Sequence, residues 1–347
     1  MLQLMLFGDA EAYPSGASSV FMCHLAAAHG TLIGESCGKE YMSVRVGIGA
    51  SLATSLAPDE FWRWVEFCEN SGIDSIWQSD QLLGPGLDPV VLLSALAVRT
   101  KRMRFGTNAL VINFRDPLVI AKEFAAIDYL SGGRLLPVFG VGAASDPYWA
   151  ATGANAKERG RRANEAINLV RLFLSQDNVA FEGAHYRYHG KGILPRPAKP
   201  IPLWIGGQSI PAIKRTAALG DGWLGSLIGP EEAGATKARI ESALLSLGRT
   251  IDSDHYGISL FMRFGAPDDP QVAATREQLQ GRMPSNKRNA TSEALVVGSP
   301  EDIIQLLQQY VRAGISKFVM LPMVSDAQDL MSQTDYLVRY VLKEIEG

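Results

Sequence analysis

Residues 202–225 read PLWIGGQSIPAIKRTAALGDGWLG, and this stretch contains one complete strand-helix-strand unit. The apolar run Pro202–Gly206 predicts a buried strand, and Gly222–Gly225 predicts a second one. Between them, Pro211–Leu219 has the spacing of an amphipathic helix, and two glycines separate it from the first strand. A helix between two buried strands favours parallel pairing of those strands.

The same alternation of short buried strands and amphipathic helices runs from residue 42 almost to the end of the chain. The predicted strands are Val44–Ala50, Ser75–Ser79, Arg104–Val111, Leu135–Val141, Pro202–Gly206, Gly222–Gly225, Tyr256–Phe264 and Lys317–Leu321. The predicted helices are Asp59–Ser71, Pro89–Thr100, Pro117–Leu130, Glu158–Gln176, Pro211–Leu219, Glu231–Leu247, Glu301–Ala313 and Asp335–Ile345. This pattern predicts an α/β fold with a single (β/α)8 TIM barrel, whose reactive face lies at the carboxyl ends of the strands. An open doubly wound sheet is the alternative.

Two insertions interrupt the alternation. Asn178–Lys199 follows the fourth helix and predicts a hairpin with a proline-rich linker. Ala266–Val297 follows the seventh strand, is polar, and has no sustained period. Long loops on a rigid scaffold commonly form lids, so we expect at least one of these segments to border the active site.

Residues 1–41 do not share the pattern of the rest of the chain. They contain short apolar pieces broken by Gly, Ser and Pro, with no sustained period of two or of 3.6. Met42, in contrast, is followed almost at once by the first predicted strand. We therefore expect the barrel domain to be residues 42–347, and residues 1–41 to be either a disordered extension or a stretch upstream of the true start.

Composition excludes several classes of protein. Lys and Arg number 33 and Asp and Glu 36, so the net charge of −3 offers no excess of positive charge to nucleic acid or to an anionic membrane surface. No apolar run is long enough to span a bilayer. Three cysteines make neither a disulfide framework nor a metal cluster, and no pair of histidines has zinc-ligand spacing. We expect a cytoplasmic enzyme without a metal.

Several local motifs, taken in order, match one family. They are Trp77–Gln81, Gly106–Leu110, Asp116–Pro117, Ile127–Arg134, Phe139–Gly142, Glu158–Gly160, Phe181–Gly183, Pro202–Gly207 and Asp221–Trp223. In this order and spacing they resemble the bacterial luciferase-like superfamily, whose members use FMN or the deazaflavin F420. The resemblance covers Met42 to about Ile345 and implies a flavin-type cofactor, while it leaves the substrate open.

The glycine turn after the fifth strand is the candidate phosphate site. Gly206, Gly207, Gln208 and Ser209 close the strand and open a helix, where unpaired N–H groups and the positive helix end suit an anion. The resemblance implies that the flavin phosphate lies near here. The alternative is a glycine turn in which Ser209 serves as the helix N-cap.

Two further segments are candidates for contact with the flavin ring. The resemblance implies that Thr107, Asn108 and Ala109 form a bulge, often with a non-prolyl cis peptide, that supports the central ring. Alternatively, Asn108 is an inward polar residue that is hydrogen-bonded within a barrel layer. After the fourth strand, the segment formed by Gly140, Val141 and Gly142 could let the backbone approach the ring or let two elements pack closely.

The candidate catalytic residues are Gln81, Asp80 and Asn108. Family members often carry histidine in the segment that matches Ser79–Gln81, and neither Asp80 nor Gln81 replaces imidazole near neutral pH. A general base contributes about 10²- to 10⁴-fold, so its loss is most harmful to alcohol oxidation and less harmful to oxygenation. Asp80 could instead cap the second helix or fix an adjacent arginine.

These considerations predict a monooxygenase that uses reduced FMN and O2 to oxidise a small, apolar organic substrate. No GxGxxG unit for NAD(P)H follows an early strand, so we expect a separate NAD(P)H:flavin reductase as partner. The first alternative is an F420-dependent dehydrogenase or reductase, and the second is a flavin-binding protein without turnover.

The F420 tail carries several carboxylates, which a cluster of basic residues would bind. FMN is favoured over F420 because the sequence shows no obvious cluster of this kind. The basic residues near the reactive face, Arg115, Arg187, Lys191 and Arg196, are interspersed with acidic ones. Candidates for an apolar lid are Phe114, Trp149, Tyr186 and Tyr188. Asp128 with Arg134, and Asp221, are expected to form structural ion pairs, and the resemblance implies a homo-oligomer.

Overall fold

The computed structural model describes residues 43–50, 56–281 and 294–345. The expectation for residues 1–41 therefore lies outside the described residues. No helix in the described ranges is both long and apolar enough to cross a membrane.

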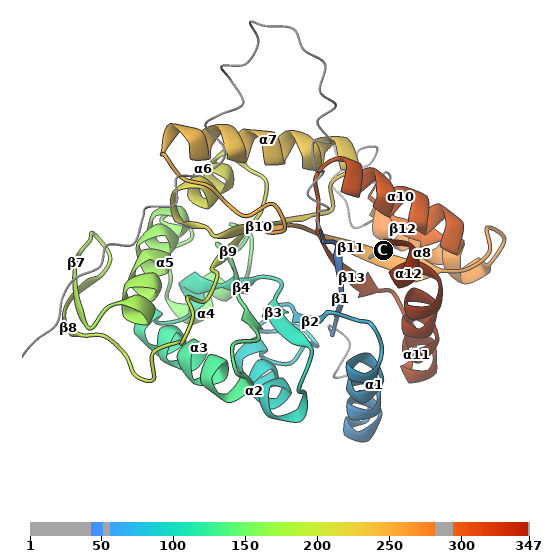
Figure 1. Cartoon of the computed structure of the whole chain (residues 1–347), viewed down its shortest axis with the longest axis horizontal. Helices are drawn as coiled ribbons and strands as arrows, with labels where there is room; N and C mark the ends of the chain where they lie inside the picture. Colours follow the sequence, from blue (N-terminus) through green and yellow to red (C-terminus); the bar gives the residue numbers. More distant parts are fainter. Residues whose placement is uncertain (1–42, 51–55, 282–293, 346–347) are drawn as a thin grey trace, which may run out of the picture. The chain divides into compact units, whose positions relative to one another are not determined.

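Parallel strands form the centre of the fold (Figure 1). They are β1 (Arg45–Gly49), β2 (Ser75–Gln78), β3 (Arg104–Thr107), β4 (Leu110–Val111), β5 (Leu135–Leu136), β6 (Val138–Gly140), β9 (Trp204–Gly206), β10 (Gly222–Ser226), β11 (Tyr256–Phe264) and β13 (Lys317–Pro322). The third and fourth predicted strands are each broken in two, into β3 with β4 and β5 with β6. Because β3 pairs with β5 and β4 pairs with β6, the order β1-β2-β3/β4-β5/β6-β9-β10-β11-β13-β1 closes into a ring of eight parallel strands. The predicted barrel is confirmed.

One side chain, that of Thr107, joins the two interrupted strands. The hydroxyl of Thr107 donates to the carbonyl of Val138 and accepts from its N–H, both at 2.8 Å. Thr107 is fully buried, so this double hydrogen bond replaces part of the backbone ladder where it is interrupted. The hydroxyl of Thr107 therefore serves the sheet and not a ligand.

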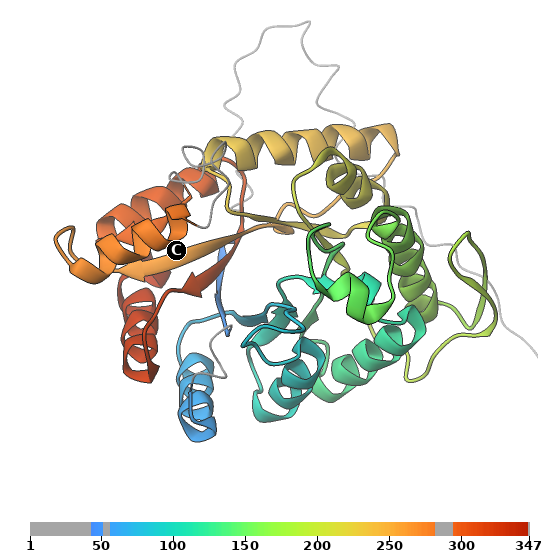
Figure 2. The same cartoon turned by 180° about the vertical axis from the view of Figure 1, so that it is seen from behind.

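Helices lie around the outside of the ring of strands, as both views show (Figures 1 and 2). They are α1 (Pro58–Asn70), α2 (Pro89–Arg99), α3 (Pro117–Ser131), α4 (Tyr148–Thr152), α5 (Arg159–Ser175), α6 (Ile210–Leu219), α7 (Pro230–Ser246), α8 (Pro270–Gly281), α10 (Pro300–Arg312), α11 (Ala327–Tyr336) and α12 (Lys343–Ile345), with a 3-10 turn η2 (Ile112–Phe114) and a π-helical turn η4 (Leu337–Leu342). The short helix α4 and the helix α8 were not predicted. The last helical region begins at Ala327, eight residues before the predicted start at Asp335.

Both insertions contain secondary structure. The first forms the predicted hairpin, in which β7 (Asn178–Glu182) pairs with the antiparallel strand β8 (Arg187–Lys191). The carboxylate of Glu165 on α5 fixes its turn by accepting three backbone N–H groups, those of Ala184, His185 and Tyr186. The second insertion contains α8 and a short strand, β12 (Val296–Gly298), which pairs with β11 and was not predicted.

A buried ion pair joins two strands at the amino end of the barrel. Lys317 opens β13, and its Nζ contacts the carboxylate of Asp74, which directly precedes β2. Burial by itself would raise the pKa of Asp74, but the charge and hydrogen bond of Lys317 hold that pKa below its usual value. The pair therefore contributes to stability whenever Asp74 is ionised.

We predict that Asp74→Asn lowers the free energy of unfolding by about 3 to 5 kcal/mol at pH 7, because it leaves the buried charge of Lys317 without its carboxylate. The folded-state pKa of Asp74 is the lower one. The stabilisation is thus complete above the ordinary aspartate pKa of 3.8 and is lost as the pH falls through the folded-state value. Urea denaturation at pH 7 and below pH 4 measures both effects. Asp59→Asn, which breaks an exposed pair with Arg63, is the matched control and should cost less than about 1 kcal/mol.

Candidate functional site

The residues singled out in the sequence gather at the carboxyl ends of the strands. They are Asp80, Gln81, Thr107, Asn108, Ala109, Gly140, Val141, Gly142, Gly206, Gly207, Gln208 and Ser209. Since all strands of the ring are parallel, their carboxyl ends open onto one face, where enzymes of this architecture carry their active sites. The structure separates these residues into those that could contact a ligand and those that hold the scaffold.

Ala109, Gly140 and Gly206 form a floor of small residues on three adjacent strands. A Cβ atom added at Gly140 would lie 3.4 Å from the Cβ of Ala109, and one added at Gly206 would lie 3.5 Å from it. The other atoms near these positions are also at ordinary van der Waals distances. No side chain larger than a methyl group therefore rises from this patch, which fits a flat ring system such as a flavin.

Asn108 crosses the mouth of the barrel. The peptide between Asn108 and Ala109 is cis, and the Asn108 Nδ2 group donates a 2.8 Å hydrogen bond to the hydroxyl of Ser259, a buried residue of β11. The interpretation of Asn108 as an inward, hydrogen-bonded residue is thus confirmed. The bond joins the third strand to the seventh, with β6, β9 and β10 on one side of it and β13, β1 and β2 on the other.

The turn between β9 and α6 has the geometry of a capped anion site. Gly207 has a φ of 101°, which favours glycine, and Ser209 caps α6 by accepting from the N–H of Ala212 at 3.3 Å. The Gln208 amide donates to the carbonyl of Ser226 at 3.3 Å, which ties the turn to β10. Within the described part of the chain, the backbone N–H groups of Gln208 and Ser209 have no acceptor, so they remain for a ligand.

Gly142 and Val141 serve local packing. Gly142 has a φ of 75°, and a Cβ there would lie 3.0 Å from Trp149. The carbonyl of Val141 accepts from the side chain of Asn113 at 3.1 Å. Phe114 packs edge-on against Trp149, with ring centroids 4.7 Å apart, so these two lid candidates form a wall beside Gly142.

Asp80 is a positioning residue. Its carboxylate accepts from both terminal nitrogens of Arg115 at 2.5 and 3.1 Å and from the N–H of Val111 at 2.9 Å, and its side chain is 1% exposed. Burial would lower the pKa of Arg115, but Asp80 and Asp88 together raise it. Asp88, and not Asp80, caps α2. The carboxylate expected as a catalytic group instead holds Arg115 and β4 in place.

On the β1, β2, β11 and β13 side of Asn108 lies a pocket of about 570 Å³. Gln81 and Ser79 line it near β2, and Arg263 lines it from β11. Gln81 is exposed and is the one candidate catalytic side chain that borders this space. The pocket shares no lining residue with the small-residue floor among the described residues.

Of three other expectations, two were wrong and one is confirmed. Arg134 does not pair with Asp128, because its guanidinium binds the backbone carbonyls of Ala97, Thr100, Met103 and Ser131. Tyr188 is not a lid residue, since it packs against Phe173 of α5. Asp221 does form the expected structural ion pair, with Arg171 at 2.7 Å.

The first turn of α5 carries three arginines, of which only Arg159 lay in a motif quoted from the sequence. Arg159, Arg161 and Arg162 lie where α5 begins, at the carboxyl end of the strands, and none of them forms an ion pair with a described residue. Arg215 of α6 donates to the carbonyl of Gly160 at 3.1 Å and so ties this turn to the helix that follows the glycine turn. The motif Glu158–Gly160 marked the segment, but only the fold brings it near Gly207.

The four basic residues that the sequence placed near the reactive face do not lie together in the structure. Arg115 is occupied by Asp80 and Asp88, Arg187 contacts Glu182 at 3.5 Å, and Arg196 contacts Asp177 at 2.8 Å, just beyond the end of α5. Lys191 lies at the end of β8 that pairs with Asn178. These four do not form a site.

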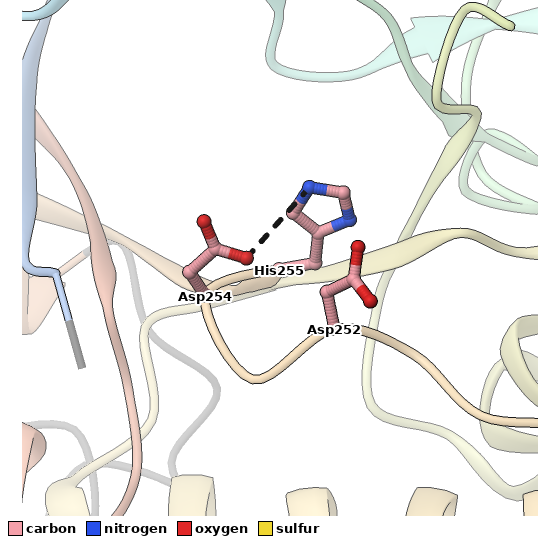
Figure 3. Close-up of side chains that lie close together, drawn as sticks. All are labelled: Asp252, Asp254 and His255. Atoms are coloured by element: carbon pink, nitrogen blue, oxygen red, sulfur yellow. Dashed lines mark ion pairs between the residues drawn. The ribbon is translucent and has the colours of Figure 1, made fainter. Parts of the chain in front are cut away.

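One group of side chains in the described residues has the composition of a metal site. Asp252, Asp254 and His255 lie within reach of one another on the loop that leads into β11 (Figure 3). This loop is at the amino end of the strands, opposite the candidate site, and both carboxylates are exposed. The His255 ring contacts the carbonyl of Asp221 at 2.7 Å, which accounts for its position.

Comparison with known proteins gives the family. The model of the luciferase-like monooxygenase family matches residues 42–317. The chain belongs to this family.

Luciferase-like proteins similar to this chain have several activities. The chain is 28% identical over 325 residues to an F420-dependent glucose-6-phosphate dehydrogenase of Amycolatopsis mediterranei, covering 84% of this chain and 96% of that protein. A solved F420-dependent secondary alcohol dehydrogenase superposes with a TM-score of 0.75 at 19% identity, covering 88% of this chain and 99% of that one. The monooxygenase RslO1 of Streptomyces bottropensis superposes with a TM-score of 0.70 at 20% identity, covering 86% and 99%. The chain is an oxidoreductase of the luciferase-like family.

We predict that Gly140→Val and Gly206→Val each weaken the binding of FMN and of F420 at least tenfold, because the added methyl groups raise the floor on which the ring would lie. The fold should tolerate the first added carbon, which meets no atom closer than 3.4 Å. Fluorescence titration with both cofactors and thermal unfolding measure the two effects. Gly281→Ala, at an exposed glycine with no neighbour within 4 Å, is the control. Unchanged affinity in both floor variants would contradict the assignment.

Proposed function

We propose that this luciferase-like protein is an F420-dependent oxidoreductase, the alternative that the sequence left open beside an FMN-dependent monooxygenase. The observation that carries the proposal is the cluster of Arg159, Arg161 and Arg162 at the start of α5, which Arg215 links to α6, the helix that follows the glycine turn. The curated relative from Amycolatopsis, matched over most of both chains, is named as F420-dependent and supports the same cofactor.

The argument rests on the charge that each cofactor brings. FMN ends in a phosphate, for which the N–H groups of Gln208 and Ser209 and the start of α6 are sufficient. F420 extends beyond its phosphate into a tail with several carboxylates. Three arginines without carboxylate partners, at the start of a helix that no side chain caps, supply the positive charge that such a tail needs.

The residues of the site fit a hydride-transfer reaction. When bound, F420 supplies or accepts the hydride. Ala109, Gly140 and Gly206 would support the ring, and the bond from Asn108 to Ser259 would keep its edge beside the pocket. Gln81 can donate a hydrogen bond to a ligand in the pocket.

We propose that the reaction is the reduction of a substrate by F420H2. No Asp, Glu or His lines the pocket in the described part of the chain, so the proton that the reduction consumes comes from water. The same lack of a base also fits oxygenation by reduced FMN and O2, with a separate NAD(P)H:flavin reductase, which is the second candidate function.

We predict that F420H2 binds at least 100-fold more tightly than FMNH2, a gap of about 2.7 kcal/mol, in anaerobic titrations of the cofactor-free protein. The double variant Arg161→Ala/Arg162→Ala should lose about tenfold in affinity for F420 and little for the deazaflavin ring without phosphate and tail. Arg312→Ala, in the last turn of α10, is the matched control. Equal or tighter binding of FMNH2, followed by product formation only with O2, would favour the monooxygenase instead.

We also propose that the protein is a homo-oligomer. The neighbouring helices α2 and α3 expose large apolar side chains: Val91 and Val98 are 67% and 66% exposed, and Tyr129 is 72% exposed. A second copy of this chain could cover this face at little desolvation cost.

The double variant Val91→Lys/Val98→Lys is therefore predicted to shift the protein to monomers in size-exclusion chromatography with light scattering. Leu245→Lys, on α7 and 78% exposed, is the control and should leave the mass unchanged. A wild-type protein that is monomeric at micromolar concentration would rule the proposal out.

A further inference from the structure

The pocket on the β1, β2, β11 and β13 side of Asn108 is lined by apolar side chains and by a smaller number of polar ones. The apolar side chains around it include Leu56, Phe61, Phe261, Leu321, Met323 and Leu330. The polar groups that line it, apart from Arg263, are uncharged Ser, Thr and Gln side chains of the described residues, among them Gln278 of α8. The second insertion thus forms a wall of the pocket, and the volume of about 570 Å³ is in the usual range for a small organic ligand.

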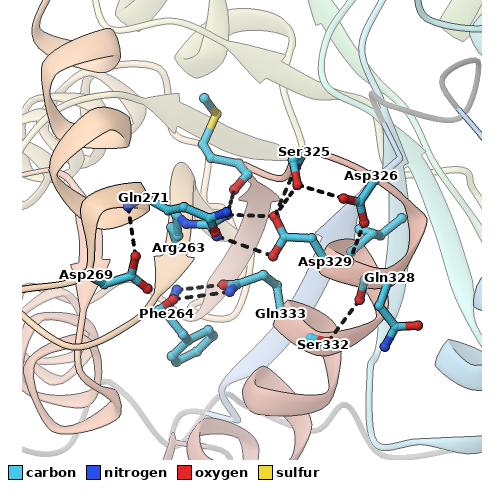
Figure 4. Close-up of polar contacts among 12 residues, drawn as sticks. Arg263, Phe264, Asp269, Gln271, Ser325, Asp326, Gln328, Asp329, Ser332 and Gln333 are labelled. Carbon is cyan, nitrogen blue, oxygen red and sulfur yellow. Dashed lines mark hydrogen bonds and ion pairs between the residues drawn. The ribbon is translucent and has the colours of Figure 1, made fainter.

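Arg263 is the one cationic side chain among the described residues that line the pocket, and its charge is already paired. Its Nη1 donates to Asp329 at 2.9 Å and to the carbonyl of Met323 at 2.6 Å, while its Nη2 donates to Gln271 and, at 3.4 Å, to Asp329. Its side chain is 5% exposed. Asp329 is held in turn by the N–H of Ser325 at 2.9 Å, and Figure 4 shows it between Arg263 and Ser325.

One donor of Arg263 is left over. A guanidinium has five N–H groups, and the four on its terminal nitrogens are used. The Nε is buried and has no hydrogen-bond partner within the described residues. Because this Nε has almost no exposed surface, Arg263 offers no accessible unpaired donor to a ligand in the pocket.

We infer that the pocket binds an uncharged, mainly apolar carbonyl compound, and not a sugar phosphate such as the substrate in the name of the Amycolatopsis relative. A phosphate ester would bring nearly two negative charges into a largely apolar space whose one cation is neutralised by Asp329. A neutral carbonyl oxygen needs only one donor, such as an amide of Gln81 or Gln278. The reaction in this inference rests on the proposed function, whereas the class of ligand rests on the pocket alone.

The reaction that follows is a two-electron reduction. The carbonyl carbon receives a hydride from the reduced cofactor, the C=O π bond breaks, and the oxygen receives a proton from water. The carbonyl compound becomes an alcohol, and the cofactor is oxidised.

The test measures ligand binding to the full-length protein without added cofactor, using the tryptophan fluorescence of the pocket residue Trp64. The probes are 2-decanone, decanoate and glucose 6-phosphate. We expect 2-decanone to bind at least tenfold more tightly than decanoate, and glucose 6-phosphate not to compete with it at millimolar concentration. Trp64→Phe should remove most of the signal, which locates the binding. Binding of glucose 6-phosphate equal to or tighter than that of 2-decanone would overturn the inference.

A charge-neutralising substitution tests the cause. Asp329→Asn leaves the charge of Arg263 unpaired, so the affinity for decanoate should rise at least tenfold while that for 2-decanone stays within threefold. Asp326→Asn, at the neighbouring N-cap of α11 that does not touch Arg263, is the matched control and should change neither. Unchanged selectivity in a folded Asp329→Asn protein would refute the role of the ion pair, and if that variant does not fold, the wild-type selectivity still decides.

The outcome is independent of the cofactor assignment. If F420H2 fails to bind but 2-decanone is preferred, the proposed function falls and the ligand class stands. If F420H2 binds tightly, 2-decanone should oxidise it, as followed by absorbance, and glucose 6-phosphate should not reduce oxidised F420.

Discussion

Closure of the ring across two broken strands is the constraint on which the site depends. The hydroxyl of Thr107 binds both backbone groups of Val138, so the third and fourth strands stay in register although each is interrupted. The strand breaks at Asn108, whose N–H still donates to the carbonyl of Gln78 while its side chain reaches Ser259 on the far side of the barrel. It also places Ala109 next to Gly140 and Gly206. The break in the third strand thus creates both the floor of small residues and the hydrogen bond from Asn108 to Ser259 that crosses the barrel.

At the carboxyl end of the barrel, the two sides of Asn108 differ in charge. On the side of β6 and β9, the first turns of α5 and α6 combine helix N-termini with arginines that have no carboxylate partner. On the other side, Arg263 is matched by Asp329, and the pocket has no net charge among its described residues. An anionic cofactor tail and an uncharged substrate are therefore compatible with the same barrel, because each meets the electrostatics that it requires.

The place of the site could be predicted from the sequence, but the roles of its members could not. The turn Gly206–Ser209 and the segment Thr107–Ala109 follow predicted strands, so topology alone brings them to one face. Whether Asp80 is catalytic depends on Arg115, 35 residues away, and on burial that no local pattern encodes. The arginines of α5 were overlooked for the same reason, since their position beside the glycine turn exists only after β9 and α6 have packed.

Local sequence determined the strands, the helices and their alternation, because periodicity and turn residues act over a few positions and eight βα units close in one way. It also marked the hairpin of the first insertion, whose aromatic residues flank Gly183. Only the tertiary structure decided which charges are free and which are paired. Arg263 and Asp329 are 66 residues apart, and Asn108 and Ser259 are 151 apart. Such pairs depend on burial and on contacts between distant segments, and for that reason they set the chemistry of the pocket without leaving a local signal.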